Sequence, residues 1–207
     1  MQMFYKTIIR INFLFLSSVG FFSPMHRLPP AETKKWVISE TSSLCVNGST
    51  NVNKFACEIL AYGQTDTLTI TRGKNDRDVA LSGSIGLHVQ SFDCHNSIMT
   101  RDLRKTLKEK QFPVLSITFL SLNKIPDLTQ QPEAITGIVT IEIAGTRKRF
   151  EVKYQIYADA QKVVHLVGSR DINFTEFNLI PPRKLGGIIQ TKDALSVVFH
   201  LKMKALD

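Results

Sequence analysis

Three cysteines and one tryptophan are all that the 207-residue sequence has of these two residue types. Three cysteines are too few for a disulfide-rich fold, and 11 glycines with 8 prolines fit neither a collagen nor a low-complexity chain. Apolar heptads are not sustained, which excludes a coiled coil. Hydrophobic residues make up 43% of the chain, so we do not expect disorder. The length suits one domain with a substantial core.

The sequence also lacks the short motifs of common catalytic and metal sites. It contains no CxxC, HExxH, GxSxG, Walker or GxGxxG pattern. Cys94 and His95 form the one adjacent pair that suggests a catalytic nucleophile with its base, or part of a metal site. Neighbours on an extended chain point apart, whereas catalytic partners come together from distant segments. We therefore expect no enzyme, metal site or cofactor, and keep an enzyme using Cys94 and His95 as an alternative.

The N-terminus has the layout of a secretory signal. Lys6 and Arg10 precede an apolar run from Ile11 to Phe22, followed by Ser23. The run is shorter than the ~20 residues of a membrane span, although an uncleaved anchor is the alternative. We expect a signal peptide over residues 1–23, one domain over 24–207, and a periplasmic or secreted protein. Without the signal, five of the 13 phenylalanines are gone and the formal charge falls from +8 to +6.

Most of the remaining chain alternates apolar and polar residues with a period of two. This period is typical of antiparallel strands with one buried and one solvated face. Turn residues such as Gly145-Thr146 separate the strands, which favours a sandwich or a barrel. The clearest runs cover residues 81–89, 115–119, 135–143, 150–156 and 195–203.

One segment departs from this period. Ser97 to Lys110 places Met99, Leu103 and Leu107 four residues apart, with basic residues elsewhere around the turn. This spacing predicts one amphipathic helix, capped by Asn96 or Ser97 and followed by Pro113. The helix would lie on the sheet or across the mouth of a barrel.

The order of these features resembles a known family. The features, in order, are Trp36-Val37-Ile38, the stretch from Ser43 to Phe55, Ser91-Phe92-Asp93, the helix with Met99 and Arg101-Asp102, Phe112 to Phe119, Gly137 to Gly145, and Phe174 to Phe177. From about Trp36 to Leu201 the chain resembles the YceI-like family of exported bacterial lipid- and polyisoprenoid-binding proteins. The resemblance implies an all-β fold: an extended antiparallel, lipocalin-like β-barrel of about eight strands, with one amphipathic helix as lid or plug.

The resemblance also implies an apolar tunnel for one long chain: a polyisoprenoid, an isoprenoid quinone or a fatty acid. The protein would then be a non-catalytic carrier or scavenger. The alternative is a filled barrel that serves as an interaction module for a secreted or envelope partner. The lid would present Met99, Leu103 and Leu107 to the barrel. Candidates for the tunnel wall are Phe55, Leu87, Val89, Phe119, Val139, Ile141, Val152, Tyr154, Phe174 and Phe199.

The cysteines and basic clusters add two expectations. Cys57 shares the strand face of Phe55, and Cys94 lies just before the helix, so an oxidising compartment favours a Cys57–Cys94 disulfide. Cys45 is then the odd thiol; three reduced cysteines are the alternative. Basic residues cluster at 101–110, 147–149 and 183–184. Export makes nucleic acid an unsuitable partner, so an anionic membrane surface fits these clusters better.

Overall fold

The computed structural model describes residues 33–72 and 79–206. The expected signal peptide over residues 1–23 lies outside these residues, as does the start of the expected 24–207 domain. The described strands are β1 (Thr33–Ile38), β2 (Ser43–Ser49), β3 (Lys54–Ile59), β4 (Thr67–Arg72), β5 (Val79–His88), β6 (Val114–Leu122), β7 (Glu133–Ile143), β8 (Thr146–Ala158), β9 (Val164–Asn173), β10 (Arg183–Lys184), β11 (Ile189–Gln190) and β12 (Ala194–Leu206). The helical elements are α1 (Ser97–Thr106) and the 3-10 turns η1 (Val89–Ser91), η2 (Phe174–Phe177) and η3 (Leu185–Gly187).

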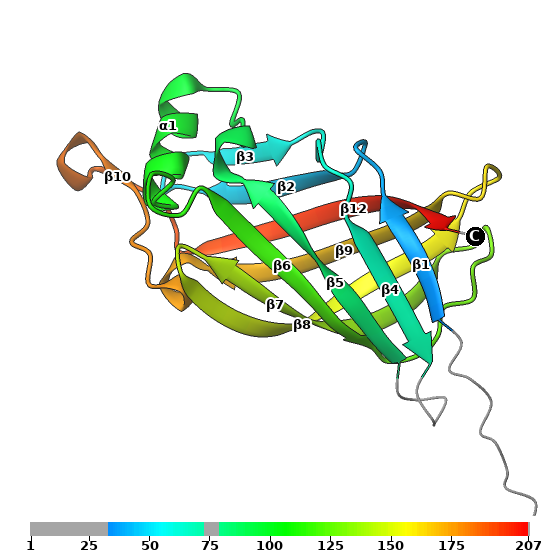
Figure 1. The fold of residues 1–207 in the computed structure, drawn as a ribbon. Helices are drawn as coiled ribbons and strands as arrows, with labels where there is room; N and C mark the ends of the chain where they lie inside the picture. The colour runs from blue at the N-terminus through cyan, green and yellow to red at the C-terminus, as the bar shows by residue number, and fades with distance from the viewer. Residues whose placement is uncertain (1–32, 73–78, 207) are drawn as a thin grey trace, which may run out of the picture. The chain divides into compact units, whose positions relative to one another are not determined.

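Eight strands close into an antiparallel barrel. The sheet runs in the order β1-β4-β5-β6-β7-β8-β9-β12, and β12 pairs with β1 to complete the ring (Figure 1). Phe150, Val152, Tyr154 and Ile156 of β8 are buried, and the residues between them are exposed. β8 thus turns one face inward and one face to solvent, as its alternating sequence requires. The expected all-β barrel with a single amphipathic helix is confirmed.

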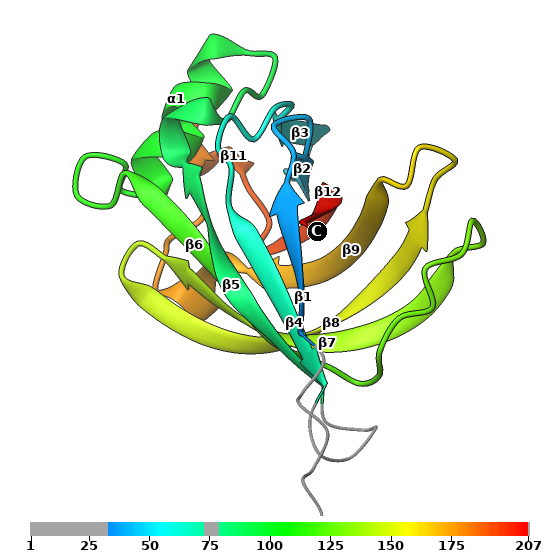
Figure 2. The same cartoon turned by 45° about the vertical axis from the view of Figure 1, so that its right-hand side comes forward.

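β12 pairs with two different strands, β2 and β1, along its length. Residues Ser196–His200 of β12 pair with β2, and residues Met203–Leu206 pair with β1. β3 follows β2 in the sheet, and its other edge meets the segment before α1 through a bridge between Glu58 and Asp93. The two backbone hydrogen bonds of this bridge are 2.7 and 2.9 Å long. The segment before α1 therefore closes the wall beside β3, at the end of the barrel where α1 lies (Figure 2).

The hydrogen bonding between β8 and β9 is incomplete. Their ladder stops at the pair Lys153–Ser169, whereas β8 stays paired with β7 up to Thr146. η2 packs against the unpaired half of β8, with the rings of Phe150 and Phe177 6.0 Å apart. Side chains, rather than main-chain bonds, therefore seal the wall at this place.

The barrel interior is solid at one end. Where β1 and β4 complete the ring, large apolar side chains are almost wholly removed from solvent, as close packing of a small barrel requires. This solid half includes Trp36, Ile38, Leu68, Leu81, Ile156 and Met203.

α1 covers the other end and is tied down by polar contacts. Asn96 caps it, because its side-chain oxygen accepts bonds from the backbone N–H groups of Ile98 and Met99. The Arg104 guanidinium donates to the Phe92 carbonyl over 2.9 Å, and the Thr100 hydroxyl accepts from the Cys94 N–H over 3.0 Å. These bonds turn Leu103 and Leu107 toward the barrel, where both are buried.

Candidate functional site

An apolar cavity occupies the end of the barrel beneath α1. The space between its walls is about 930 Å³, including the part open to solvent. Only about 80 Å³ of this space is wide enough to hold water molecules. The cavity is therefore narrow. Its walls come from β2, β5, β6, β7, β8, β9 and β12, closed by α1 and η2.

Six of the ten expected wall residues line this cavity, and two of the three lid candidates join them. Leu103 of α1 and Leu107, the C-cap residue of α1, reach the cavity. The two side chains cover the cavity from the α1 end, as a lid or a plug would. The six wall residues are Phe119, Val139, Ile141, Val152, Phe174 and Phe199.

Phe55 and Met99 lie elsewhere. Both line a separate groove between β3, α1 and the β10–β11 hairpin. The Phe55 ring lies across Gly48 on the adjacent strand, where a Cβ would stand only 2.3 Å from its Cζ. β3 is the last strand of the sheet, so Phe55 faces this groove rather than the centre of the barrel.

Leu87, Val89 and Tyr154 are buried, but they do not line the cavity. Val89 follows the end of β5 and belongs to the turn η1, so strand alternation no longer sets its direction. Leu87, opposite Leu115, packs into the core near the same end of β5. Tyr154 lies behind Phe199, with the two rings edge to face and 5.7 Å apart.

Tyr154 places an unpaired polar group in this apolar surrounding. Among the described residues its hydroxyl has no hydrogen-bond partner, although the side chain is only 2% exposed. Burial raises the pKa of the Tyr154 phenol, because the phenolate would lose its hydration. The phenol is therefore neutral and keeps a free donor behind the cavity wall.

Among the residues that the structure describes, Arg170 is the one charged residue in the cavity lining, and the sequence pattern did not reveal it. It lies just past the last β8–β9 pair, where the wall has no main-chain ladder. Its guanidinium carbon is 5.2 Å from the centroid of the Phe150 ring, and the residue is exposed. Its apolar stem can therefore line the cavity while the charged head reaches solvent.

The other lining residues had a visible signal. Leu115 and Ile117 share the strand face of Phe119, and Leu195 and Val197 share that of Phe199, so strand parity alone would have found them. The remaining lining residues are Leu44, Val46, Ile85, Phe92, Ile143, Ile172, Asn173, Phe177 and Leu179.

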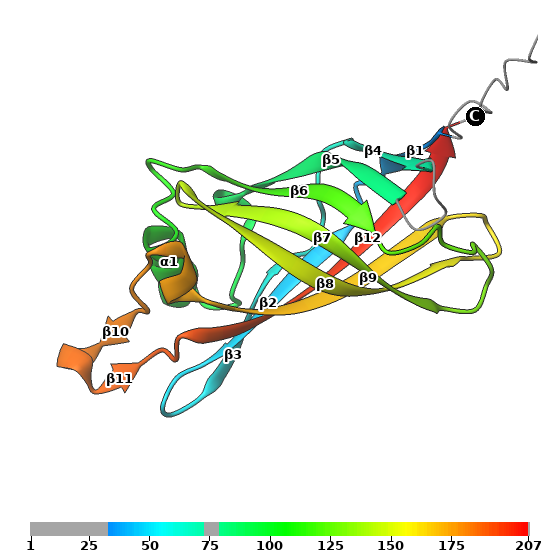
Figure 3. The ribbon, with the colours of Figure 1, turned by 90° about the horizontal axis from the view of Figure 1, so that it is seen from below.

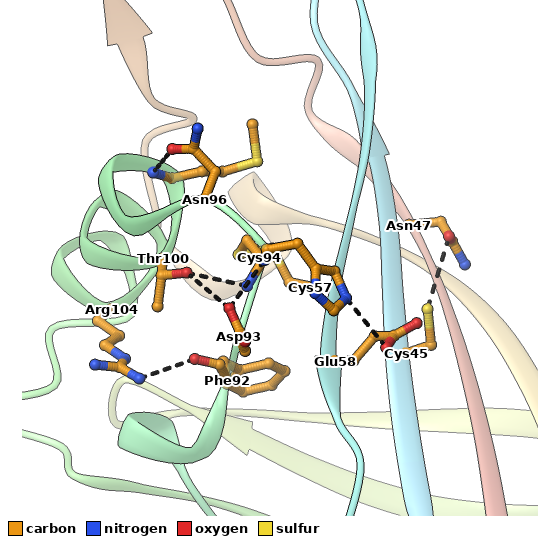
Figure 4. The surroundings of a disulfide bond; sticks show 12 residues. Cys45, Asn47, Cys57, Glu58, Phe92, Asp93, Cys94, Asn96, Thr100 and Arg104 are labelled. Carbon is orange, nitrogen blue, oxygen red and sulfur yellow. Dashed lines mark hydrogen bonds and ion pairs between the residues drawn. A yellow bond between two sulfur atoms is a disulfide. The ribbon is translucent and has the colours of Figure 1, made fainter.

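A disulfide joins Cys57 of β3 to Cys94 before α1 (Figure 4). It lies beside the Glu58–Asp93 bridge and so fixes the wall next to the helix. Cys94 has no free thiol in this state, which removes the nucleophile of a Cys94–His95 enzyme. Cys45 is a free cysteine, and burial together with the nearby Glu58 carboxylate raises the pKa of its thiol.

Outside the barrel, two histidines and an aspartate form a chain of contacts. His165 Nδ1 lies 2.7 Å from His200 Nε2, and His165 Nε2 lies 3.0 Å from an Asp159 carboxylate oxygen. Tyr157 stacks on the His165 ring at 4.7 Å. Within residues 33–72 and 79–206 no three His, Cys, Asp or Glu side chains are arranged to hold a metal ion. In the same ranges no helix is long and apolar enough to cross a membrane.

The closed ring, solid at one end and hollow at the other, defines a lipocalin-like barrel with an internal apolar cavity. No protein-family model matches the chain, and no curated protein matches it. Solved structures do. A polyisoprenoid-binding domain from Saccharophagus degradans implicated in plant cell wall breakdown is 11% identical, with a TM-score of 0.60 over 83% of this chain and 98% of that one.

Burkholderia cenocepacia BcnA is 15% identical, with a TM-score of 0.53 over 82% of this chain and 95% of that one. The Campylobacter jejuni YCEI protein is 14% identical, with a TM-score of 0.47 over 68% and 80%. The shared feature is the fold. The chain has the barrel fold of the polyisoprenoid-binding domain and of BcnA, so the fold implied by the resemblance in its sequence is confirmed.

Proposed function

We propose that the protein holds one long apolar chain inside its barrel and does not convert it chemically. The ligand class is a polyisoprenoid, an isoprenoid quinone or a fatty-acid-like lipid, and the protein acts as its carrier or scavenger. One observation carries this proposal: the cavity walls are apolar except for Arg170 and Asn173. The polyisoprenoid-binding domain of Saccharophagus degradans, which has the same fold, supports the ligand class.

The energetics of such a wall suit an apolar chain. Burying one CH₂ group stabilises a complex by about 0.8 kcal/mol, so about ten groups contribute roughly 8 kcal/mol before ordering costs. A net free energy of this size corresponds to about micromolar affinity, so the ordering costs make micromolar the upper limit of the affinity for ten groups. The cavity is narrow, so small movements of the wall side chains accompany uptake of the ligand.

Arg170 supplies the polar end of the proposed site. Its head lies at the edge of the cavity, and no acidic residue of the described chain is within ion-pair distance of it. A guanidinium forms its strongest hydrogen bonds with carboxylate and phosphate groups. A ligand with an anionic head group, such as a fatty acid or a polyprenyl phosphate, therefore satisfies both the wall and its edge.

The proposal includes export to an oxidising compartment. The Cys57–Cys94 disulfide fits a periplasmic or secreted protein, because thiols stay reduced in the cytosol. The basic N-terminal stretch with its apolar run is the other support.

Mass spectrometry of an organic extract of the purified protein tests the proposal, together with titration of a fluorescent fatty acid and of a prenol. We expect a co-purified lipid or uptake of one of these probes at about one molecule per chain. The variant Ile141→Trp fills the cavity from a half-exposed wall position and should abolish uptake while the barrel stays folded. An empty extract together with no uptake of either probe would overturn the proposal.

The filled barrel that serves as an interaction module is the second candidate, and the narrow cavity favours it. Phe119→Ala separates the two. In a filled core this truncation costs stability alone, about 3–5 kcal/mol. In a ligand site it also changes the affinity for the probes, because Phe119 lines the cavity.

A further inference from the structure

A groove on the outside of the barrel leads to the wall of the cavity. It lies between the start of β3, α1 and the β10–β11 hairpin. About 450 Å³ of this groove is wide enough to hold water molecules. Leu103 and Phe174 line this groove and also line the internal cavity. These two side chains therefore separate the groove from the cavity.

The hairpin that borders the groove is held firmly to the barrel. Thr50, in the β2–β3 turn, forms a bridge with Thr191, and the Asn51 amide donates to the Ile188 carbonyl over 2.8 Å. The same Asn51 side chain accepts from the Gln190 N–H over 3.0 Å. Figure 3 shows the hairpin projecting beyond the end of the barrel, on the side where α1 lies. Its tip is thus a fixed projection.

Large apolar side chains are exposed on the three segments around the groove: residues 49–54, 97–111 and 180–192, here called the hairpin face. Leu185 and Ile188 at the hairpin tip are 70% and 72% exposed. Val52, Ile98 and Ile180 are 65%, 51% and 80% exposed. Apolar side chains gathered in this way mark a surface that meets a partner or a membrane.

The hairpin face is also strongly basic. Its three segments contain nine lysine and arginine residues and only two acidic residues, a formal charge of +7. One of the two acids, Asp102, is already paired with Lys184. Lys54, Arg101, Arg183 and Lys192 are exposed. Fixed apolar tips within a field of exposed cations are the combination that binds an anionic lipid surface.

We propose that the hairpin face docks on a bilayer that contains anionic phospholipid. Leu185 and Ile188 enter the boundary between head groups and acyl chains, and the surrounding cations contact the lipid phosphates. The groove then opens directly to the lipid. A membrane-embedded chain passes between Leu103 and Phe174 into the cavity, a step that rests on the proposed function. Docking itself does not depend on it.

Flotation of the full chain with lipid vesicles tests the docking. We expect the protein to float with phosphatidylcholine vesicles that contain phosphatidylglycerol, to dissociate at high salt, and to stay unbound with phosphatidylcholine alone. The double variant Leu185→Glu with Ile188→Glu changes only exposed side chains and should weaken vesicle binding at least tenfold. Leu60→Glu is the matched control: Leu60 is 69% exposed but follows the other end of β3, so binding should not change.

Uptake of a fluorescent fatty acid in buffer, without vesicles, separates docking from ligand binding. The double variant should keep this uptake and lose only transfer of the probe from anionic vesicles. If the wild-type protein takes up the probe in buffer but ignores anionic vesicles, the docking inference fails and the proposed function stands. If it floats with vesicles but takes up no probe, the proposed function fails and docking stands. Equal weakening by Leu60→Glu, or salt-independent binding to both vesicle types, would overturn the proposal, because neither the hairpin tip nor its cations would then account for the binding.

Discussion

The phenyl ring of Phe199 lies over Gly168 on the neighbouring strand β9. The two residues are opposite each other in the β9–β12 ladder, and a Cβ at position 168 would stand 2.2 Å from Cζ of the ring. The same Cβ would stand 2.8 Å from Cδ1 of Tyr154. Gly168 therefore leaves the space in which the two aromatic rings meet at the inner end of the cavity.

Gly168→Ala should close part of the cavity. A contact of 2.2 Å forces the Phe199 ring to move, and the ring already lines the cavity, so it moves at the expense of the ligand space. We expect clearly weaker uptake of a fluorescent fatty acid and a free energy of unfolding lower by about 1–3 kcal/mol, typical of overpacking. Fluorescence titration and urea unfolding measure the two effects.

Gly86→Ala is the control for this substitution. The nearest atom to a Cβ there is Cγ1 of Val114 at 3.3 Å, a contact that a small movement relieves. Uptake should be unchanged in this variant. Equal uptake by both glycine variants would show that Phe199 does not limit the ligand space.

Arg170→Met should change which ligands bind. The substitution keeps an apolar stem over the cavity edge and removes the guanidinium. Binding of a fatty acid or a prenyl phosphate should weaken about 5- to 30-fold, the loss of a charged hydrogen bond worth about 1–2 kcal/mol at a solvated site. Binding of the corresponding prenol should hold. Arg149→Met, an exposed position one residue before Phe150, should leave both affinities as they are. A parallel loss for acid and prenol would refute the head-group role.

The Cys57–Cys94 disulfide should contribute strongly to the stability of the folded protein. Cys57 and Cys94 are 37 residues apart, so the crosslink removes about 3–4 kcal/mol of loop entropy from the unfolded chain in the chain-entropy model. We expect a loss of this order for the double variant Cys57→Ala with Cys94→Ala in urea unfolding. Cys45→Ala, which removes the free cysteine, should change stability by less than about 1 kcal/mol. A double variant as stable as the wild type would contradict this estimate.

The sequence predicted the barrel well because each long strand has one buried face. Phe119, Val139 and Val152 could be assigned to the interior from parity alone, and they line the cavity. Strand alternation also placed Cys57 on the same face of β3 as Phe55, where it is buried and bonded to Cys94.

Strand alternation did not predict the side-chain direction where the backbone leaves the β-sheet. Val89 lies in a 3-10 turn and does not line the cavity. Arg170 has inward parity, but its charge suggested a solvated position. Its environment depends on where the β8–β9 ladder ends, a tertiary property that no local pattern in the sequence records.

Tyr154→Phe should stabilise the protein. The Tyr154 hydroxyl is buried without a partner among the described residues, so its removal relieves a desolvation cost of about 1–2 kcal/mol. Tyr62→Phe should do the opposite, because the Tyr62 hydroxyl donates to Asp66 and accepts from the Gly86 N–H over 3.1 Å. Thermal and urea unfolding of the two variants compare them directly. A destabilised Tyr154→Phe variant would mean that the hydroxyl does have a partner, such as an ordered water.

Stability should fall between neutral and mildly acidic pH because of the His165–His200 contact. Burial lowers the pKa of His200, with the charges of His165 and Lys202 adding to the effect. A folded-state pKa below the unfolded value near 6.5 means that the unfolded chain binds the proton first, so this stability is present above about pH 6.5 and is lost as pH falls from there through the lower folded-state pKa. Two protonated imidazoles would also turn N–H groups toward each other across the 2.7 Å contact.

His200→Gln tests this pH dependence, with His88→Gln at an exposed position as the control. We expect the free energy of unfolding to decline less steeply from pH 7.5 to pH 5 in His200→Gln than in the wild type, and His88→Gln to follow the wild type. Asp159 acts in a separate, lower window. The hydrogen bond from His165 lowers the pKa of this carboxyl, so its contribution is present above about pH 4 and is lost only below that. Urea unfolding across both windows therefore assigns each decline to one group, and a wild-type slope retained in His200→Gln would rule out His200 as the source of the first.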